Sequence, residues 1–171
     1  MLTVKEVEAK ARMLEDQNYE FRAFLKRNAD ADELDEQFKQ LHNELFANYD
    51  CCKCCNCCCA CHIVVEDSEI AAIAESVGQS TESFIIEHLT KGEEGEYHLK
   101  SSPCEFLDES GRCKIQHFKP NVCKKYPHTD QPRRLSSMYS IIESAKVCPV
   151  VFEILERLKK LYRFGNKRKR N

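Results

Sequence analysis

The chain has 171 residues, a net charge of −2 and twelve cysteines. This length predicts one domain, with or without an appendage. The near-neutral charge disfavours nucleic acid as a partner, and no apolar run approaches the roughly 18 residues of a membrane span. Because no secretory signal is visible at the N-terminus, we expect a cytoplasmic protein whose cysteines bind metal rather than form disulfides.

The N-terminal part of the chain is predicted to be helical. In residues 3–26, apolar side chains recur three and four positions apart, which is the spacing of a heptad seam. A second helix is predicted to begin at a cap formed by Asp30 or Asp32 and to end near Asn48. The two helices either pack on the rest of the domain or form a helical hairpin, resembling a coiled coil, that recruits a protein partner.

Eight of the twelve cysteines lie between Cys51 and Cys61. An ordinary hydrophobic core does not need such a run, whereas thiolates bind zinc, copper(I) and iron–sulfur clusters. Four thiolates complete a tetrahedral zinc site or hold one [4Fe–4S] cluster. Two interleaved sets of four meet this requirement: Cys51, Cys54, Cys57 and Cys58, or Cys52, Cys55, Cys58 and Cys59. Asn56, which tolerates a left-handed turn, mildly favours the second set.

Alternating short strands and helices are predicted after the cysteine run. Residues 63–65 are apolar and β-branched, and residues 97–99 alternate apolar with polar side chains, so both segments are expected to be extended. Two helices are predicted between them, one capped by Asp67 or Ser68 and one over residues 80–89.

A hairpin is predicted between Cys104 and Cys113. Two short apolar runs flank the sequence Asp-Glu-Ser-Gly, in which Gly111 would supply the positive φ of the turn. Such a hairpin would bring the two cysteines towards each other, so that both could bind the same metal.

The C-terminal part combines an irregular stretch with a helix. Prolines around Cys123 restrict the backbone and suit a ligand loop. Cys148 precedes Pro149, a favourable residue for the first turn of a helix that is predicted to end near Gly165. We expect this helix to pack back on the cysteine-cluster core.

The predicted metal ligands are therefore four cysteines of the run and the four that follow it. They are Cys52, Cys55, Cys58, Cys59, Cys104, Cys113, Cys123 and Cys148. Three histidines, His62, His117 and His128, are additional candidates. The expected cofactor is an iron–sulfur cluster or zinc.

Several motifs occur here in one order. The pattern C-x2-C-x2-C-C from Cys52 is followed by an apolar segment, by Pro-Cys-x-Phe-Leu-x5-Cys-x-Ile from Pro103, and by Pro-x2-Cys-x2-Tyr-Pro from Pro120. This arrangement resembles the CxxCxxCC zinc- or iron-chelating family, also known as the YkgJ-like cysteine-cluster proteins, to which the flagellin lysine N-methylases look related. The resemblance covers roughly Cys51 to Pro127, with Cys148 and Pro149 as a last element. It implies the fold and the metal site of that family.

Departures from the family pattern concern single positions. Asn56 stands where the family usually has glycine, and lysines stand at Lys119 and Lys124 where it usually has arginines. An activity that requires those arginines is therefore not implied for this chain.

These observations predict a mainly α fold with a small β-hairpin. An N-terminal helical hairpin (1–48) precedes a cysteine-rich, metal-centred core that ends in the C-terminal helix (49–164), and a basic tail (165–171) follows.

The predicted function is metal binding with a redox, regulatory or structural role. The alternatives are an enzyme related to protein lysine methylases, a thiolate protein for metal storage or delivery, and an adaptor. Because the five glycines form no G-x-G loop and no nucleophile pair stands out, we do not expect an enzyme on its own.

Replacing Cys58 tests the arrangement of the ligands in the cysteine run. Cys58 belongs to both candidate sets, so Cys58→Ser should sharply lower the metal content measured by elemental analysis. Cys61→Ser is the matched control, because Cys61 lies outside both sets and its loss should matter less. Full metal retention by Cys58→Ser would contradict the proposed sets.

Overall fold

The computed structural model describes residues 2–49 and 63–165. Within these residues the chain forms eight helices and a small three-stranded antiparallel sheet, which confirms the mainly α fold with a small β element. Two compact units are present: unit 1 comprises Met1–Asp50 with Pro127–Asn171, and unit 2 is Cys51–Tyr126. The three-part division at residues 48 and 164 stays a prediction. No helix in the described ranges is long and apolar enough to cross a membrane.

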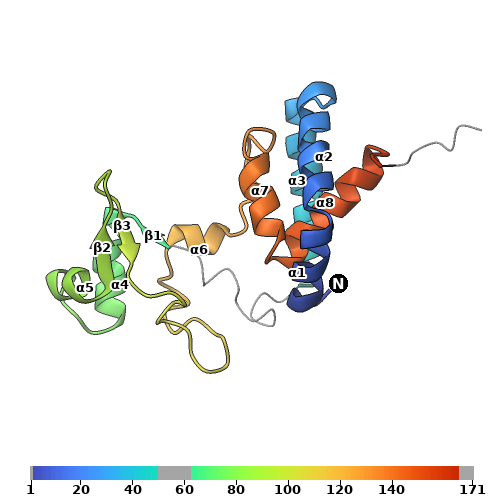
Figure 1. The fold of residues 1–171 in the computed structure, drawn as a ribbon. Helices are drawn as coiled ribbons and strands as arrows, with labels where there is room; N and C mark the ends of the chain where they lie inside the picture. The colour runs from blue at the N-terminus through green and yellow to red at the C-terminus, as the bar shows by residue number, and fades with distance from the viewer. Residues whose placement is uncertain (1, 50–62, 166–171) are drawn as a thin grey trace, which may run out of the picture. The chain divides into compact units, whose positions relative to one another are not determined.

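Unit 1 is a bundle of helices from both ends of the chain. Helix α2 packs against α7, and α8 packs against α1, α3 and α7 (Figure 1). The helices are α1 (Val4–Met13), α2 (Glu15–Asn28), α3 (Ala31–Phe46), α7 (Met138–Ala145) and α8 (Pro149–Leu161). Apolar side chains of the three N-terminal helices are buried in this bundle, namely Val7, Ala11, Phe21, Leu25, Leu34, Phe38 and Leu45. A protein partner for these helices stays a prediction.

Residues 3–26, predicted to be one helix, form two helices that meet at Leu14. The backbone of Leu14 has φ −103° and ψ 8°, which departs from helical values. The interruption allows α1 to pack on α8 while α2 packs on α7. Heptad spacing of apolar residues continues across Leu14, so periodicity did not reveal the break.

Helix α8 provides much of the core of unit 1. It begins at Pro149, as predicted, with Cys148 as the preceding cap residue. Its buried face contains, among others, Val150, Val151, Ile154, Leu155 and Leu158. Its packing partners α1, α3 and α7 belong to unit 1, and the expected packing of this helix on the cysteine-cluster core stays a prediction. Its apolar face therefore complements the apolar faces of the N-terminal helices.

Helix α7 was not predicted from the sequence. Its buried residues are Met138, Ile141, Ile142 and Ala145, which follow the three- and four-residue spacing of a helix face. The pattern is only eight residues long, and the prolines of the preceding segment favour an irregular backbone, so the sequence did not indicate a helix here. That segment also contains α6 (Asn121–Lys125), a single turn of helix in a region predicted to be irregular.

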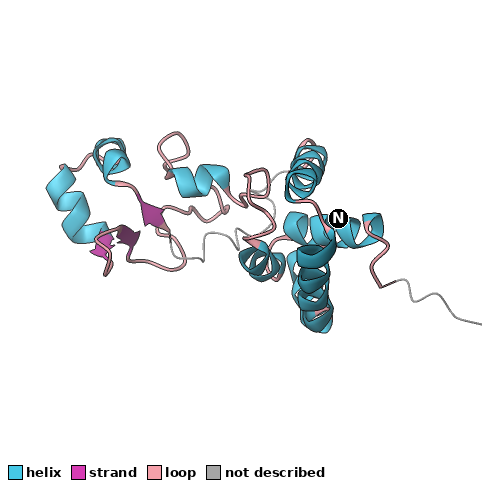
Figure 2. Ribbon diagram, turned by 90° about the horizontal axis from the view of Figure 1, so that it is seen from above, coloured by secondary structure: helices cyan, strands magenta, loops and turns pink. Residues whose placement is uncertain are grey.

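Unit 2 contains all the strands of the described chain (Figure 2). Strand β3 lies between β1 and β2 and pairs antiparallel with both. The elements in order are β1 (Val64–Val65), α4 (Asp67–Ser76), α5 (Thr81–His88), β2 (Leu89–Lys91) and β3 (Tyr97–Leu99), followed by α6. The predicted extended segments 63–65 and 97–99 are confirmed. Leu89, which was expected to lie on one side of the helix that starts at Ser80, instead begins β2 and pairs with Leu99.

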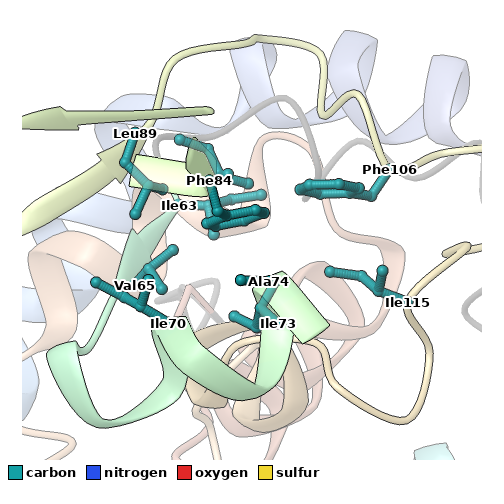
Figure 3. Close-up of a cluster of buried hydrophobic side chains, with 10 residues drawn as sticks. Ile63, Val65, Ile70, Ile73, Ala74, Phe84, Leu89, Phe106 and Ile115 are labelled. Atoms are coloured by element: carbon teal, nitrogen blue, oxygen red, sulfur yellow. The ribbon is translucent and has the colours of Figure 1, made fainter. Parts of the chain in front are cut away.

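One apolar cluster forms the core of unit 2. Residues from the sheet, from α4 and α5 and from the segment after β3 all contribute to it (Figure 3). The rings of Phe84 and Phe106 stack, with centroids 6.1 Å apart and an interplanar angle of 14°. The full set is Ile63, Val65, Ile70, Ile73, Ala74, Phe84, Leu89, Leu99, Phe106 and Ile115.

Two leucines of α8 test the burial pattern of unit 1. Leu155 is 1% exposed and Leu161 is 59% exposed. Leu155→Ala should lower the free energy of unfolding by about 2–5 kcal/mol because it leaves a cavity in the core. Leu161→Ala, the same change on the same helix, should change it by about 0.5 kcal/mol or less. Urea denaturation measures both, and similar losses in the two variants would contradict this packing.

Candidate metal centre

The predicted ligands fall into two groups in the structure. Cys52, Cys55, Cys58 and Cys59 lie outside the described residues, as do the other cysteines of the run and His62. Cys104, Cys113, Cys123 and Cys148 are described. The choice between the two ligand sets of the run therefore stays a prediction, and the described part of the site consists of the later cysteines.

Three of the later cysteines pack against the apolar cluster of unit 2. Cys104, Cys113 and Cys123 are each partly buried against it. They come from three separate segments: the stretch after β3, the turn that follows it, and helix α6. The fold therefore brings the segments of these three cysteines to one core, although the residues are up to 19 positions apart in the sequence.

The predicted turn between Cys104 and Cys113 is present. Leu107 and Cys113 form an antiparallel β-bridge, and Gly111 has a positive φ of 79°. One carboxylate oxygen of Asp108 accepts hydrogen bonds from the amides of Ser110 (2.8 Å) and Arg112 (2.9 Å) and from the Ser110 hydroxyl (2.6 Å). These bonds, with that of the Ser110 hydroxyl first, lower the pKa of Asp108. The carboxylate form therefore stabilises the turn that precedes Cys113.

A histidine–carboxylate pair holds the residue after Cys104. The Nδ1 atom of His88 lies 2.8 Å from Oε2 of Glu105, and the Ser101 hydroxyl donates to the other oxygen of Glu105 at 3.1 Å. The His88 ring also packs on Phe84 and Phe106. This pair was missed from the sequence, because 17 residues separate the two side chains and no local pattern connects them.

A second carboxylate links α4 to α6, the helix that carries Cys123. Glu69 accepts the backbone amide of Glu66 (3.1 Å) through one oxygen and the backbone amide of Asn121 (2.7 Å) through the other. Glu66 is the N-cap of α4, so the prediction that Asp67 or Ser68 caps this helix was wrong. A glutamate with a second glutamate three residues later forms a capping box here, which replaces the expected short side chain.

Cys148 and the candidate histidines have other surroundings. Cys148 is buried in unit 1 as the cap residue of α8. His128 also belongs to unit 1, whereas His117 is an exposed residue of unit 2. Across residues 2–49 and 63–165, no three histidine, cysteine or acidic side chains form a group that could hold a metal ion. A complete centre would therefore need ligands from the cysteine run.

The described residues fit a soft metal. The three cysteines of unit 2 lie at the margin of an apolar cluster. The carboxylates of Asp108 and Glu69 accept backbone amides, and that of Glu105 is engaged by the side chains of His88 and Ser101. In zinc and iron–sulfur sites, sulfur ligands are typically surrounded by apolar side chains, and hydrogen bonds from neighbouring residues fix the segments that carry these ligands.

Asp108 provides a test of the turn. Because its pKa is lower in the folded chain, its stabilising effect is present above the unfolded value of about 3.9 and is lost as the pH falls through the folded value. Asp108→Ala should therefore increase amide hydrogen exchange at Ser110 and Arg112 at neutral pH. Glu109→Ala is the control, since Glu109 is exposed and its side chain makes no hydrogen bond or ion pair with another residue of the described ranges. Equal exchange in the two variants would refute this role.

Comparison with known proteins identifies the family. The family model CxxCxxCC, described as "Putative zinc- or iron-chelating domain", matches residues 50–149. No curated protein and no solved structure matches the chain. The matched region contains all the predicted cysteine ligands, which supports metal binding as its general property. Because the match spans more than half of the 171 residues, the chain belongs to the CxxCxxCC family.

Proposed function

We propose that unit 2 holds a tightly bound thiolate centre of zinc or of an iron–sulfur cluster. Its ligands would come from Cys52, Cys55, Cys58 and Cys59 together with the later cysteines of unit 2. The observation that carries this proposal is the packing of Cys104, Cys113 and Cys123 against one apolar cluster. Cys148 stays a predicted ligand.

The size of unit 2 supports a structural contribution from the metal. Unit 2 spans residues 51–126, and a unit of fewer than about 80 residues rarely obtains more than about 3–5 kcal/mol from its hydrophobic core alone. Its sheet contains only two or three residues in each strand. A metal that joins thiolates from several segments would add binding free energy directly to folding.

The role of the centre depends on which metal it holds. Zinc has no redox chemistry and would give a structural centre. An iron–sulfur cluster could accept and donate electrons, and its potential would depend on nearby charges and hydrogen bonds. The alternative of metal storage predicts a different behaviour, namely several loosely held ions that leave without unfolding the domain.

Anaerobic purification with metal and acid-labile sulfide analysis tests the proposal. We expect about one or two metal ions per chain if zinc is bound, or iron with matching sulfide and a broad visible absorption band. Removing the metal with a chelator should expose the amides of α4 and α5 to hydrogen exchange while those of α8 in unit 1 stay protected. A large, variable metal load without such unfolding would favour storage, and a chain with disulfides and no metal would refute the centre.

Substitutions at two neighbouring residues distinguish a role of Cys123 as a metal ligand from a role in packing. Cys123 and Val122 both pack partly buried against the cluster of unit 2. Cys123→Ser should lower the metal content, whereas Val122→Ala keeps every thiol and should leave the content unchanged. If both variants lose metal equally, the loss reflects damage to the cluster and Cys123 is not a ligand.

A further inference from the structure

The charges of unit 2 are strongly segregated along its sequence. Residues 63–110 carry twelve acidic and two basic side chains, a net charge of −10. Residues 111–126, which we call the basic segment, carry no acidic side chain and five basic ones: Arg112, Lys114, Lys119, Lys124 and Lys125. The segment includes Cys113 and Cys123.

The basic segment is fixed on the apolar cluster by its inner residues. Cys113, Ile115, Val122 and Cys123 pack against that cluster. Arg112, Lys114, Lys124 and Lys125, which flank these inner residues in the sequence, are exposed. The positive charges therefore lie on the outer side of a segment whose inner side is held by packing.

The five cations form no salt bridges with the described carboxylates. The pKa of Asp108 is lowered first by the hydrogen bond from the Ser110 hydroxyl, and the charge of Arg112 adds a smaller contribution in the same direction. Lysines 114 and 119 reach a backbone carbonyl of Glu105 and the side chain of Gln116, both at 3.4 Å. Among the described residues these cations therefore have no carboxylate salt-bridge partner, which leaves them suited to an anionic surface outside the chain.

The basic segment also contains an exposed aromatic side chain. Phe118 lies between the two cysteine positions of the basic segment and is 47% exposed. Aromatic side chains are enriched at the centre of protein interfaces, whereas charged residues such as lysine lie mainly at the polar rim, so Phe118 would supply the apolar contact and the lysines the charged surroundings.

We propose that the basic segment is a docking surface for a protein partner with an acidic surface and an apolar contact for Phe118. Nucleic acid fits less well, because its phosphates carry charge along their whole length and would extend from the basic segment onto the twelve carboxylates of residues 63–110, whereas a folded protein can confine its acidic side chains to the docking area. The same carboxylates make unit 2 electrically asymmetric, so an acidic partner is steered towards the basic segment. This docking surface does not depend on which metal the unit holds.

Charge reversal tests the docking surface in the full chain with its metal. We use poly-L-glutamate as the probe and measure its affinity at several salt concentrations. Lys124→Glu with Lys125→Glu should weaken binding at least tenfold. The matched control is Lys91→Glu with Lys100→Glu, which changes the net charge of the same unit by the same amount outside the basic segment and should have a clearly smaller effect.

The other outcomes separate this proposal from its alternatives. Equal losses in the two double variants, or no binding of poly-L-glutamate, would overturn it. Tighter binding of single-stranded oligothymidylate than of poly-L-glutamate would assign the surface to nucleic acid instead. Self-association in ultracentrifugation that Lys124→Glu with Lys125→Glu abolishes would assign it to a second copy of the chain.

Two further measurements show whether weaker probe binding reflects loss of the docking surface or loss of the metal. The metal content of every variant is determined, and Lys124→Glu with Lys125→Glu should keep it unchanged. If that variant loses metal, Lys119→Glu and Phe118→Ala replace it, because neither residue is adjacent to a predicted cysteine ligand. Unweakened probe binding in both would then overturn the docking surface without bearing on the proposed centre.

Discussion

Burial of a few apolar side chains places the cysteine-bearing segments of unit 2. Phe106 follows Cys104 by two residues, Ile115 follows Cys113 by two, and Val122 directly precedes Cys123. Phe106 and Ile115 belong to the cluster and Val122 packs against it. The burial of Phe106 and of Ile115 contributes on the order of 1.5–3 kcal/mol each, and the partly buried Val122 contributes less. Packing of these neighbours therefore brings the thiols to one core, and the polar contacts of Glu69, Asp108 and Glu105 then fix the local backbone.

Local signals in the sequence predicted part of this fold correctly. Gly111 marked the turn, Pro149 marked the start of α8, and alternation marked the strand at residues 97–99. Features determined by tertiary packing were missed. The break at Leu14 depends on α1 and α2 having different partners, and β2 begins at Leu89 because Leu99 is there to pair with it.

The candidate site likewise has one part that the sequence predicted and one part that it did not. Residue type alone singled out the cysteines, because few roles other than metal binding explain so many thiols in one run. The supporting contacts have no such signature: His88 meets Glu105 across 17 residues, and Asn121 meets Glu69 across 52. Ordinary histidines, glutamates and asparagines acquire these roles only when the chain has folded.

The span of the apolar cluster affects how the protein can be made. Its residues extend from Ile63 to Ile115, and Cys123 packs on its edge, so the core cannot close until residue 123 has left the ribosome. The cysteine run emerges about sixty residues earlier, which at roughly 5–20 residues per second is a delay on the order of seconds. During that interval the thiols of the run are present before the apolar cluster of unit 2 has formed. The order of synthesis thus exposes them to oxidants and to metals before unit 2 has folded.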